Sequence, residues 1–554
     1  MWGEVQVMRK LLLAAAAAIM ATPACAQPAV EATAVPGAPK LIVALSIDQL
    51  SADLYDEYRP ILLGGIGRLS RGTVFSNGYQ SHNLTETCPG HSTIMTGSRP
   101  SRTGIIGNYW FDLSQERSDK GVYCSEDERV EGSSSTAYTV SPYHLRVPTL
   151  GDLLKKAQRN SRNVAVAGKD RSAVMMGGRA VDQRWYWDGK TFATDLKAAA
   201  MPRSVAAAKQ AVATAIAQDR PPLEMPAPCK ARSQVIPLEG GGAPVGSGTF
   251  ARKAGDPRAF RATPEFDGAT LALAASLIQE MQLGRGSSTD IISIGLAGTD
   301  VIGHSFGSEG AEMCLQLFSL DRDLADFFRL LDSTGIDYLV VLTADHGVQD
   351  IPERRRLGGV PNAARVDAAL TAKDVGARVG TDLGLTGPVL YGEGSFGDMY
   401  VDRALSPGDQ ARAKAAAVAK FRAHPQVEAV FTKEQLAATL SPTSPPDQWS
   451  LIERARASFD AERSGDFVVL LKKDITPIAS TKSYAATHGS PWDYDRRVPI
   501  LFWRRGMTHS VRTEAIETAD IMPTLAASIG LAIDANSIDG QCLAGVEQVS
   551  CPSR

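Results

Sequence analysis

Four short apolar segments of this chain each end in charged or imidazole side chains. They are KLIVALSID, ending at Asp48; NVAVAGKDR, ending with Lys169 and Arg171; TDIISIGLAGTD, ending at Asp300; and IDYLVVLTADHG, ending with Asp345 and His346. Apolar, often β-branched runs are typical of buried parallel strands, whose carboxyl ends open on the crevice where ligands bind. Helical stretches such as 265–282 lie between them. The sequence therefore predicts an α/β fold with a central, mostly parallel sheet flanked by helices.

Two regions interrupt this alternation and are predicted to be insertions. Residues from about 200 to 262 are rich in Pro, Gly and Ala, which predicts a loop-rich segment. Residues from about 351 to 480 contain a strand-like run at 396–403, an Ala-rich helical run at 409–424 and a second strand-like run at 427–436. The second insertion is therefore predicted to be a small α+β module.

Composition excludes several classes of protein. The 58 Lys and Arg residues nearly balance 61 Asp and Glu residues, so no basic excess argues for nucleic-acid binding. A hydrophobic content of 44% over 554 residues is that of a globular chain, neither disordered nor fibrous. The oligomeric state stays open, a monomer included. Composition therefore indicates no binding partner, and substrates or ligands have to be inferred from candidate site residues.

The first residues predict export. Arg9 and Lys10 precede the apolar run LLLAAAAAIMAT, and ACA at 24–26 is a small-residue cleavage pattern before Gln27. We therefore interpret residues 1–26 as a secretory signal peptide and expect a periplasmic or secreted protein. A membrane anchor is disfavoured because the run is shorter than the ~20 residues a spanning helix needs, and no later segment is longer. A lipoprotein acylated at Cys25 is disfavoured by the residues that precede it.

The remaining six cysteines are an even number, and disulfides are expected in an oxidising compartment. Cys542 and Cys551 are close in sequence and are predicted to pair. Cys88, Cys124, Cys229 and Cys314 allow three pairings, which the sequence leaves open. Acidic loops such as CSEDER, starting at Cys124, leave room for additional Ca²⁺.

Acidic and imidazole side chains predict a metal centre. Asp300 and His304 are four residues apart, so on a helix they share a face. Asp345 and His346 follow an apolar strand, as Asp48 does, and His488 lies in ATHGSP. Three aspartates and three histidines favour a two-metal site, and mixed His/Asp ligation suits zinc, with manganese or iron as alternatives.

The other histidines are interpreted as surface or packing residues, because they lack a carboxylate at metal-ligand spacing: His82, His144, His424 and His509. His91 is interpreted as orienting the loop in which it lies.

The segment NLTETCPGHS offers a candidate nucleophile. Pro89 and Gly90 suit the first turn of a helix, where free N–H groups favour an oxyanion or a phosphate. Thr87 precedes that turn, with Thr85 upstream and Cys88 next in sequence. A thiolate would need a free Cys88, which disagrees with export. Threonine is a weak nucleophile unless a metal ion lowers its pKa, and the six ligands above would supply that ion.

Seven segments, in order, carry a resemblance to a known family. They are SIDQL, TETCPGHSTIMTGSRP, GIIGNYWFD, AGKDRSAVMMGG, GTDVIGH, TADHG and THGSPWDYDRRVPI. Together they resemble the alkaline phosphatase superfamily, and most closely the exported PafA/PhoK type of alkaline phosphatase with a threonine nucleophile. The resemblance implies an alkaline-phosphatase-like catalytic domain over 40–554 and two zinc ions per chain.

The resemblance also implies roles for single residues. Asp300, His304 and His488 would hold one zinc ion, and Asp48, Asp345 and His346 the other, toward which Thr87 would bridge. Thr87 would become phosphothreonine by in-line displacement between the two ions and then be released by hydrolysis. Asn108, in GNYW, matches the family's phosphate-contacting asparagine.

The pair Lys169 and Arg171 bears on the class of substrate. Two residues apart in extended geometry, both would point toward the crevice. A dianionic monoester has one more charged oxygen than a diester, and two cations favour it selectively. The related nucleotide pyrophosphatase/phosphodiesterases lack this pair as phosphate contacts. We therefore expect a phosphomonoesterase with small-molecule substrates and broad tolerance for the leaving group.

Several alternatives remain beside this one. The runner-up is a phosphodiesterase or nucleotide pyrophosphatase of the same superfamily. A sulfatase would need a C-x-P-S-R type motif, which CPGHS does not match, and a serine esterase would need a G-x-S-x-G elbow between a strand and a helix. A non-catalytic zinc- or phosphate-binding protein would have no need of Thr87 or Asn108. RWYWDGK, before and after Trp185, is either an aromatic wall of the site or packing, with packing favoured.

Overall fold

A ten-stranded sheet forms the centre of the computed structural model, which describes residues 37–197 and 200–552. Its path runs β17-β2-β16-β9-β1-β8-β5-β6-β7, and β18 pairs with β2. The strands are β1 (Leu41–Ile47), β2 (Thr73–Tyr79), β5 (Asn163–Ala167), β6 (Gln183–Trp187), β7 (Phe192–Ala193), β8 (Asp290–Leu296), β9 (Tyr338–Thr343), β16 (Arg497–Arg504), β17 (Ser510–Arg512) and β18 (Ile516–Glu517). The predicted signal peptide, residues 1–26, lies outside the described residues.

The middle of the sheet is parallel, as the sequence predicts. β9, β1, β8, β5 and β6 run in the same direction, and four of them are the apolar segments that precede the polar residues noted above. β16 is antiparallel to both β9 and β2. The fold is therefore α/β with a mixed, mostly parallel sheet.

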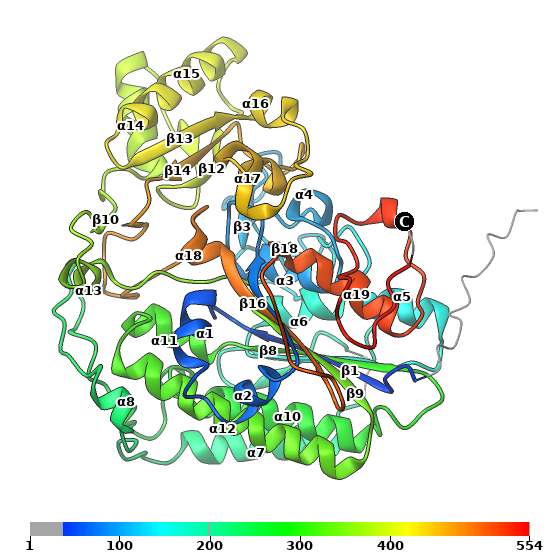
Figure 1. The fold of residues 1–554 in the computed structure, drawn as a ribbon. Coiled ribbons are helices and arrows are strands. Elements are labelled where there is room, and N and C mark those ends of the chain that lie inside the picture. The colour runs from blue at the N-terminus through cyan, green and yellow to red at the C-terminus, as the bar shows by residue number, and fades with distance from the viewer. Residues whose placement is uncertain (1–36, 198–199, 553–554) are drawn as a thin grey trace, which may run out of the picture. The chain divides into compact units, whose positions relative to one another are not determined.

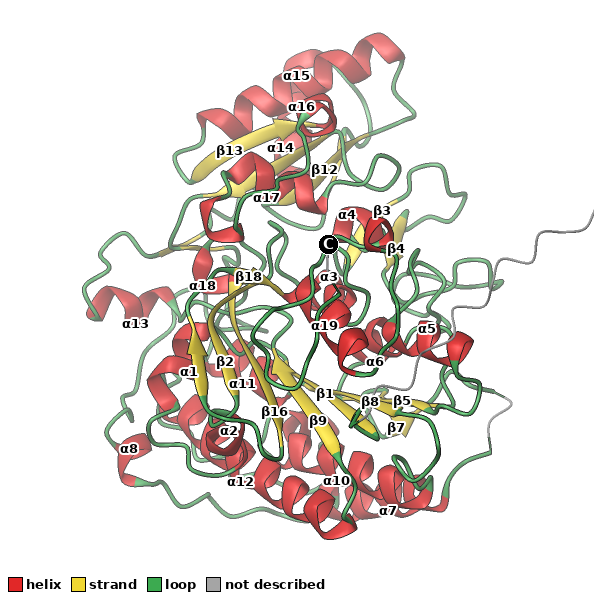
Figure 2. Ribbon diagram, turned by 45° about the vertical axis from the view of Figure 1, so that its right-hand side comes forward, coloured by secondary structure: helices red, strands yellow, loops and turns green. Residues whose placement is uncertain are grey.

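Both faces of the sheet are covered by helices (Figures 1 and 2). Along β1, Leu41, Val43, Leu45 and Ile47 pack into one core cluster, while Ile42 and Ala44 pack into another. This alternation follows from the two-residue period of a strand. The first cluster is shared with α2 (Gly65–Leu69), α7 (Arg203–Ile216), α10 (Glu265–Glu280) and α12 (Ala311–Thr334); the second with α3 (Thr87–Ile94), α5 (Leu150–Ala157), α6 (Asp170–Gly177) and α19 (Ile521–Ser528).

Residues from about 351 to 480 build a small second sheet with its own core. Its order is β11 (Leu390–Tyr391), β12 (Gly397–Val401), β14 (Phe467–Leu471) and β13 (Val427–Thr432), all antiparallel. α14 (Ala372–Leu383) and α15 (Pro407–Ala423) pack on it. The strand, helix and strand predicted at 396–403, 409–424 and 427–436 correspond to β12, α15 and β13.

Residues from about 200 to 262 contain more helix than their composition indicates. α7 covers Arg203–Ile216, and two short helices follow, α8 (Ala227–Lys230) and α9 (Pro257–Arg261). Val205, Val212 and Ile216 share one face of α7 and are buried in the core cluster that includes α10. Alanine has the highest helix propensity, and burial of this apolar face in the core stabilises the Ala-rich helix further.

All six cysteines that follow the predicted signal peptide are paired. The predicted Cys542–Cys551 bond is confirmed, and the other bonds are Cys88–Cys124 and Cys229–Cys314, the latter joining α8 to α12. Within residues 37–197 and 200–552, no helix has both the length and the apolar character needed to cross a membrane.

Candidate active site

The polar residues that follow the central strands meet at the carboxyl edge of the sheet. Asp48 follows β1, and Asp345 and His346 follow β9. Asp300 and His304 lie on α11 (Gly298–Phe306), the helix that starts after β8. His488 comes from the long connection between the small module and β16. Because neighbouring parallel strands end at one edge, residues far apart in sequence come together there.

Two groups of buried ligand atoms are suited to metal ions. In one group, atoms of Asp48, Asp345 and His346 lie within 4.8 Å of one another, and in the other those of Asp300, His346 and His488 do so. His346 belongs to both groups, and its ring stacks on that of His488 with centroids 3.5 Å apart. The site therefore offers two adjacent positions of mixed carboxylate and imidazole ligation.

His304 lies at the edge of the second position. Its Nε2 is 3.2 Å from Asp300 Oδ1, while the rings of His304 and His488 are 5.0 Å apart between centroids. The compact group around Asp300 therefore contains His346, where the family resemblance implies His304 as the third ligand. His304 still faces the same carboxylate.

The three histidines are oriented as metal ligands require. Nδ1 of His304, His346 and His488 lies 2.8, 3.0 and 2.7 Å from the carbonyl oxygens of Ala486, Gly347 and Thr85, respectively. Donation of Nδ1–H to a carbonyl leaves Nε2 as the free ligand atom. Among the described residues, the buried Asp48 Oδ1 and His346 Nε2 have no hydrogen-bond partner, and they face each other at 3.4 Å. A cation between such atoms would satisfy both.

Burial of so many ionisable groups perturbs their pKa values. Burial raises the pKa of Asp48, and the carboxylates of Asp300 and Asp345 raise it further. Burial lowers the pKa of His488 to about 3. Burial opposes the charged form of His346 as well, but the adjacent carboxylates, Asp345 first, outweigh it and raise the pKa to about 9. Concentrated negative charge of this kind is a common feature of cation sites.

Thr87 is the first residue of α3, and its hydroxyl points at two positively charged side chains. Thr87 Oγ1 lies 3.2 Å from Lys169 Nζ and 3.5 Å from Arg171 Nη2. α3 packs tightly on the loop after β9. The approach is so close that a Cβ added at Gly90 would collide with the carbonyl oxygen of Asp345. This close approach places the Thr87 hydroxyl next to the ligand groups.

Lys169 and Arg171 converge on Thr87 by a route different from the predicted one. β5 ends at Ala167, Lys169 precedes the first residue of α6, and Arg171 lies in the first turn of that helix, so the pair is not extended. The buried Lys169 Nζ also lies 2.6 Å from both Asp48 Oδ2 and Asp300 Oδ2. The helix start, rather than strand geometry, brings the two cations together.

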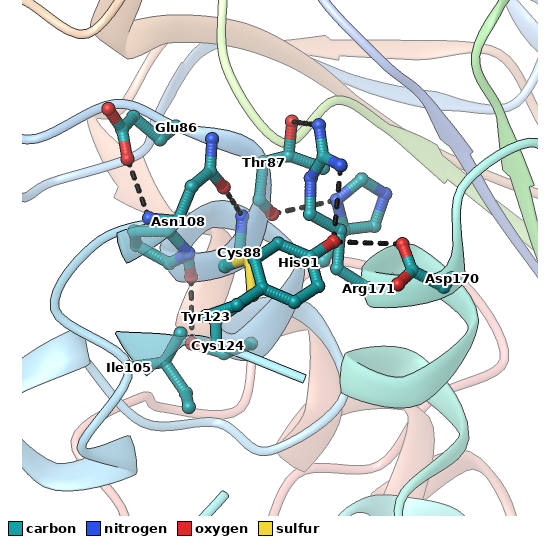
Figure 3. Close-up of a disulfide and its surroundings, with 12 residues drawn as sticks. Glu86, Thr87, Cys88, His91, Ile105, Asn108, Tyr123, Cys124, Asp170 and Arg171 are labelled. Carbon is teal, nitrogen blue, oxygen red and sulfur yellow. Dashed lines mark hydrogen bonds between the residues drawn. A yellow bond between two sulfur atoms is a disulfide. The ribbon is translucent and has the colours of Figure 1, made fainter. Parts of the chain in front are cut away.

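Asn108 borders the cavity in front of Thr87. Its Oδ1 accepts from the Cys88 backbone N–H at 2.9 Å, and its own backbone N–H donates to Glu86 Oε2 at 2.6 Å (Figure 3). Its side-chain NH₂ group therefore remains available to a ligand. The cavity has a volume of about 330 Å³ and is lined by Asn108, Arg171, His304, Tyr484 and His488, among others.

A buried tyrosine supports Arg171. The Cys88–Cys124 bond ties α3 to β4 (Gly121–Tyr123), and Tyr123 reaches the start of α6 (Figure 3). Its hydroxyl donates to Asp170 Oδ1 at 2.8 Å and accepts from Arg171 Nη1 at 3.3 Å. Nothing in the sequence singles out Tyr123, apart from its position next to a cysteine.

Gln49 is a second residue that the sequence analysis missed. Its Nε2 donates to Asp300 Oδ1 at 3.1 Å and its backbone N–H to Asp345 Oδ1 at 3.2 Å, so it orients one carboxylate of each ligand group. Its φ of 71° lies in the left-handed region. The sequence signal was its place directly after Asp48.

The remaining residues of the sequence analysis lie in the core, in the acidic loop and next to the site. Trp185 and Trp187 are buried in the core, where Trp187 packs against Phe192 and Phe266, so the packing interpretation is confirmed for these two residues. In the acidic loop, each carboxylate has a partner: Glu126 with Arg117, Asp127 with Arg129 and Glu128 with His144. His91 Nδ1 lies 2.9 Å from the Thr87 carbonyl oxygen and 3.0 Å from Asp345 Oδ2, between α3 and the loop after β9.

Comparison with known proteins agrees with this geometry. Residues 42–491 match the family described as type I phosphodiesterase / nucleotide pyrophosphatase. The chain is 53% identical to alkaline phosphatase PhoK of Sphingomonas sp. over 91% of each chain. It is 44% identical to alkaline phosphatase PhoD of Zymomonas mobilis, covering 93% of this chain and 89% of the relative.

A solved structure shows the same fold. A crystal structure of an alkaline phosphatase PafA mutant superposes with a TM-score of 0.78 at 25% identity, covering 92% of this chain and 99% of that one. In that mutant a threonine, an asparagine, a lysine and an arginine are substituted. The chain belongs to the type I phosphodiesterase / nucleotide pyrophosphatase family of the alkaline phosphatase superfamily, and within it to the PafA/PhoK type of alkaline phosphatase.

Proposed function

We propose that this alkaline phosphatase is an exported, zinc-dependent enzyme that hydrolyses a broad range of phosphate monoesters and releases inorganic phosphate. The observation that carries the proposal is the position of Thr87 Oγ1, which has Lys169 Nζ at 3.2 Å and Arg171 Nη2 at 3.5 Å, beside two groups of buried Asp and His ligands. The names of the relatives PhoK and PhoD support the activity.

Thr87 is the proposed nucleophile. Its Oγ1 attacks the phosphorus atom, the bond from phosphorus to the ester oxygen breaks, and the alcohol leaves from the opposite side. The phosphothreonine is then cleaved by water, which returns the hydroxyl and releases phosphate. Lys169, Arg171 and the Asn108 amide hold the non-bridging oxygens, where the charge of the transition state resides.

The ligand residues fit two zinc ions, which is the cofactor that we propose. Asp300, His304 and His488 would hold one, and Asp48, Asp345 and His346 the other, with Thr87 bridging toward the second. When bound, the ions would lower the pKa of the nucleophile and neutralise charge on the leaving oxygen. Mixed nitrogen and oxygen ligation also suits manganese and iron, so elemental analysis of the purified protein decides the identity.

The two cations favour a monoester over a diester. A monoester is a dianion, and Lys169 and Arg171 together supply two positive charges at the nucleophile. The alternative is a phosphodiesterase or nucleotide pyrophosphatase, which the description of the matched family supports. For the leaving group, the cavity in front of Thr87 offers aromatic walls such as Tyr109, Phe396 and Tyr484. Aromatic walls make few directional contacts, which agrees with broad tolerance for the leaving group.

The deciding experiment compares kcat/KM for p-nitrophenyl phosphate and bis-p-nitrophenyl phosphate, using zinc-loaded and chelated enzyme at alkaline pH. We expect a strong, zinc-dependent preference for the monoester. A preference for the diester would assign the chain to the phosphodiesterases, and inactivity on both would support a binding protein.

The nucleophile has a separate test. Acid-quenched parent enzyme should carry a phosphate adduct on the peptide that contains Thr87, detected by mass spectrometry. Thr87→Ala should lose turnover and the adduct while retaining both metal ions. Thr87→Ser keeps a hydroxyl and is the matched control. Loss of metal from Thr87→Ala would contradict this division of roles.

Export is supported by the predicted signal peptide and by the three disulfides. Amino-terminal sequencing of the protein from periplasmic and culture fractions should give a chain that begins at Gln27. A chain recovered in the cytoplasm with residues 1–26 intact would contradict export.

A further inference from the structure

Arg261, the last residue of α9, is a cation without a partner. Within residues 37–197 and 200–552 its guanidinium makes no hydrogen bond, ion pair or aromatic contact, and its Nε is buried. A buried donor without an acceptor costs free energy. Such a group is retained most readily where a ligand supplies the missing acceptor.

The neighbouring residue fixes Arg261 in place. Phe260 is 1% exposed, and its ring centroid lies 5.9 Å from that of Trp187 and 6.1 Å from that of Phe266. Asp256 caps the start of α9 by accepting from the backbone N–H groups of Arg258 and Ala259. The short helix is therefore anchored to the main core, and Arg261 is held on a rigid support.

Arg261 lines a cavity that adjoins the phosphate-binding cations. The cavity has a volume of about 610 Å³, and Lys169, Asp170, Arg171 and Tyr186 also line it. Arg171 lines the cavity in front of Thr87 as well, so the two cavities adjoin at its side chain. Burial and the charge of Arg171 lower the pKa of Arg261, whereas Asp300 raises it.

The acidic residues of this cavity are already engaged. Asp170 accepts from Tyr123 and Tyr138 at 2.8 and 2.9 Å. Asp195 accepts from Arg184 Nε and Nη2 at 2.8 and 2.7 Å, and Asp188 caps a turn by accepting from two backbone N–H groups. None of them pairs with Arg261, so the wall that Arg261 forms carries positive charge that the described residues leave unneutralised.

We propose that Arg261 binds a second anionic group of the substrate, a phosphate or carboxylate on the alcohol part of a phosphate monoester. The inference rests on the proposed phosphomonoesterase function and narrows it. The transferred phosphoryl group would lie with Lys169 and Arg171, and the second anion would contact the Arg261 guanidinium. The enzyme would thereby favour doubly anionic esters without excluding uncharged ones.

Two substrates with nearly the same framework test this proposal. Glycerol 3-phosphate and 3-phosphoglycerate differ in that a carboxylate replaces a hydroxymethyl group. Arg261→Ala should lower the ratio of kcat/KM for 3-phosphoglycerate to that for glycerol 3-phosphate by about tenfold, mainly through KM, as expected for a lost charge-assisted contact. Arg261→Lys keeps the charge and should restore part of the ratio.

Controls separate this role from others. Arg258→Ala removes an exposed arginine from the same helix and should leave the ratio unchanged. Arg261→Gln keeps polar donors without charge and should resemble Arg261→Ala, which guards against a folding defect in one variant. A ratio within twofold of the parent in the Arg261→Ala and Arg261→Gln variants would overturn the proposal, even if both rates fell. Failure of the parent to hydrolyse either ester would instead reject the phosphomonoesterase function.

Discussion

Replacing Tyr123 with phenylalanine should weaken catalysis through Arg171. Arg171 Nη1 donates to the Tyr123 hydroxyl at 3.3 Å, and the same hydroxyl donates to Asp170 Oδ1 at 2.8 Å. Burial and then the Asp170 carboxylate raise the pKa of Tyr123, so the hydroxyl stays protonated at alkaline pH. Tyr123→Phe would keep the ring and its packing but leave Arg171 without this acceptor.

The size of the effect follows from the contact. Hydrogen bonds to charged groups contribute about 1.5–3 kcal/mol, and one of 3.3 Å belongs at the lower end. A loss of about 1.4 kcal/mol corresponds to a tenfold fall in kcat/KM. We expect about tenfold for p-nitrophenyl phosphate and a smaller loss for bis-p-nitrophenyl phosphate, which lacks the additional charged oxygen.

Tyr138 provides a matched control. Its hydroxyl donates to Asp170 Oδ2 at 2.9 Å, as the Tyr123 hydroxyl does to Oδ1, but it makes no contact with Arg171 in the described part of the chain. Tyr138→Phe should therefore change monoester kcat/KM less than twofold, although both variants lose a hydrogen bond to Asp170.

A double-mutant cycle completes the test. If Tyr123 acts through Arg171, Arg171→Ala and the Arg171→Ala/Tyr123→Phe double variant should have the same kcat/KM. Equal losses in the two tyrosine variants, or additive losses in the double variant, would refute the reasoning.

Three further predictions concern stability and packing. Replacing Cys88 and Cys124 together with alanine should lower the free energy of unfolding by about 4 kcal/mol, because the bond closes a loop with a sequence separation of 36; urea unfolding measures this. Gly90→Ala should abolish activity, as measured on p-nitrophenyl phosphate, because its Cβ would collide with the Asp345 carbonyl oxygen and separate α3 from the ligand loop. Burial raises the pKa of Asp267 to about 7, so the folded state retains a proton that the unfolded state loses, and stability falls as pH rises from about 4 to 7. Asp267→Asn should remove up to about 3 kcal/mol of that decline between pH 5 and 8 in urea unfolding, and an unchanged pH dependence would contradict the assignment.

The sequence predicts the strand ends well and the helix starts less well. Asp48, Asp300 and Asp345 were found because apolar runs mark buried strands, and the carboxyl ends of parallel strands meet at one edge. The sequence predicts that Lys169 and Arg171 lie close together at the crevice, as the structure shows. It also predicts that both are extended, which is wrong because α6 begins between them. Local periodicity does not locate a helix start to within one residue.

The sequence analysis did not find the residues that affect the site through side-chain contacts. Gln49, Tyr123 and Arg261 reach the site from a loop, a short hairpin strand and the end of a five-residue helix. Their importance depends on tertiary contacts such as the Cys88–Cys124 bond, and four cysteines allow three pairings that the sequence cannot separate. The amino-acid sequence alone does not show which side chains contact one another in the folded protein.

The disulfide beside the proposed nucleophile also has a consequence for when the enzyme becomes active. Cys88 follows Thr87 directly, and its bond to Cys124 joins α3 to the hairpin that Asn108 precedes and Tyr123 belongs to. A newly synthesised chain in the reducing cytoplasm lacks this link. Its phosphate-binding residues would then be less firmly assembled around the hydroxyl. If the chain is exported as proposed, oxidation outside the cytoplasm would complete this assembly, and the chain would be less active among the cell's own phosphate esters than among external ones.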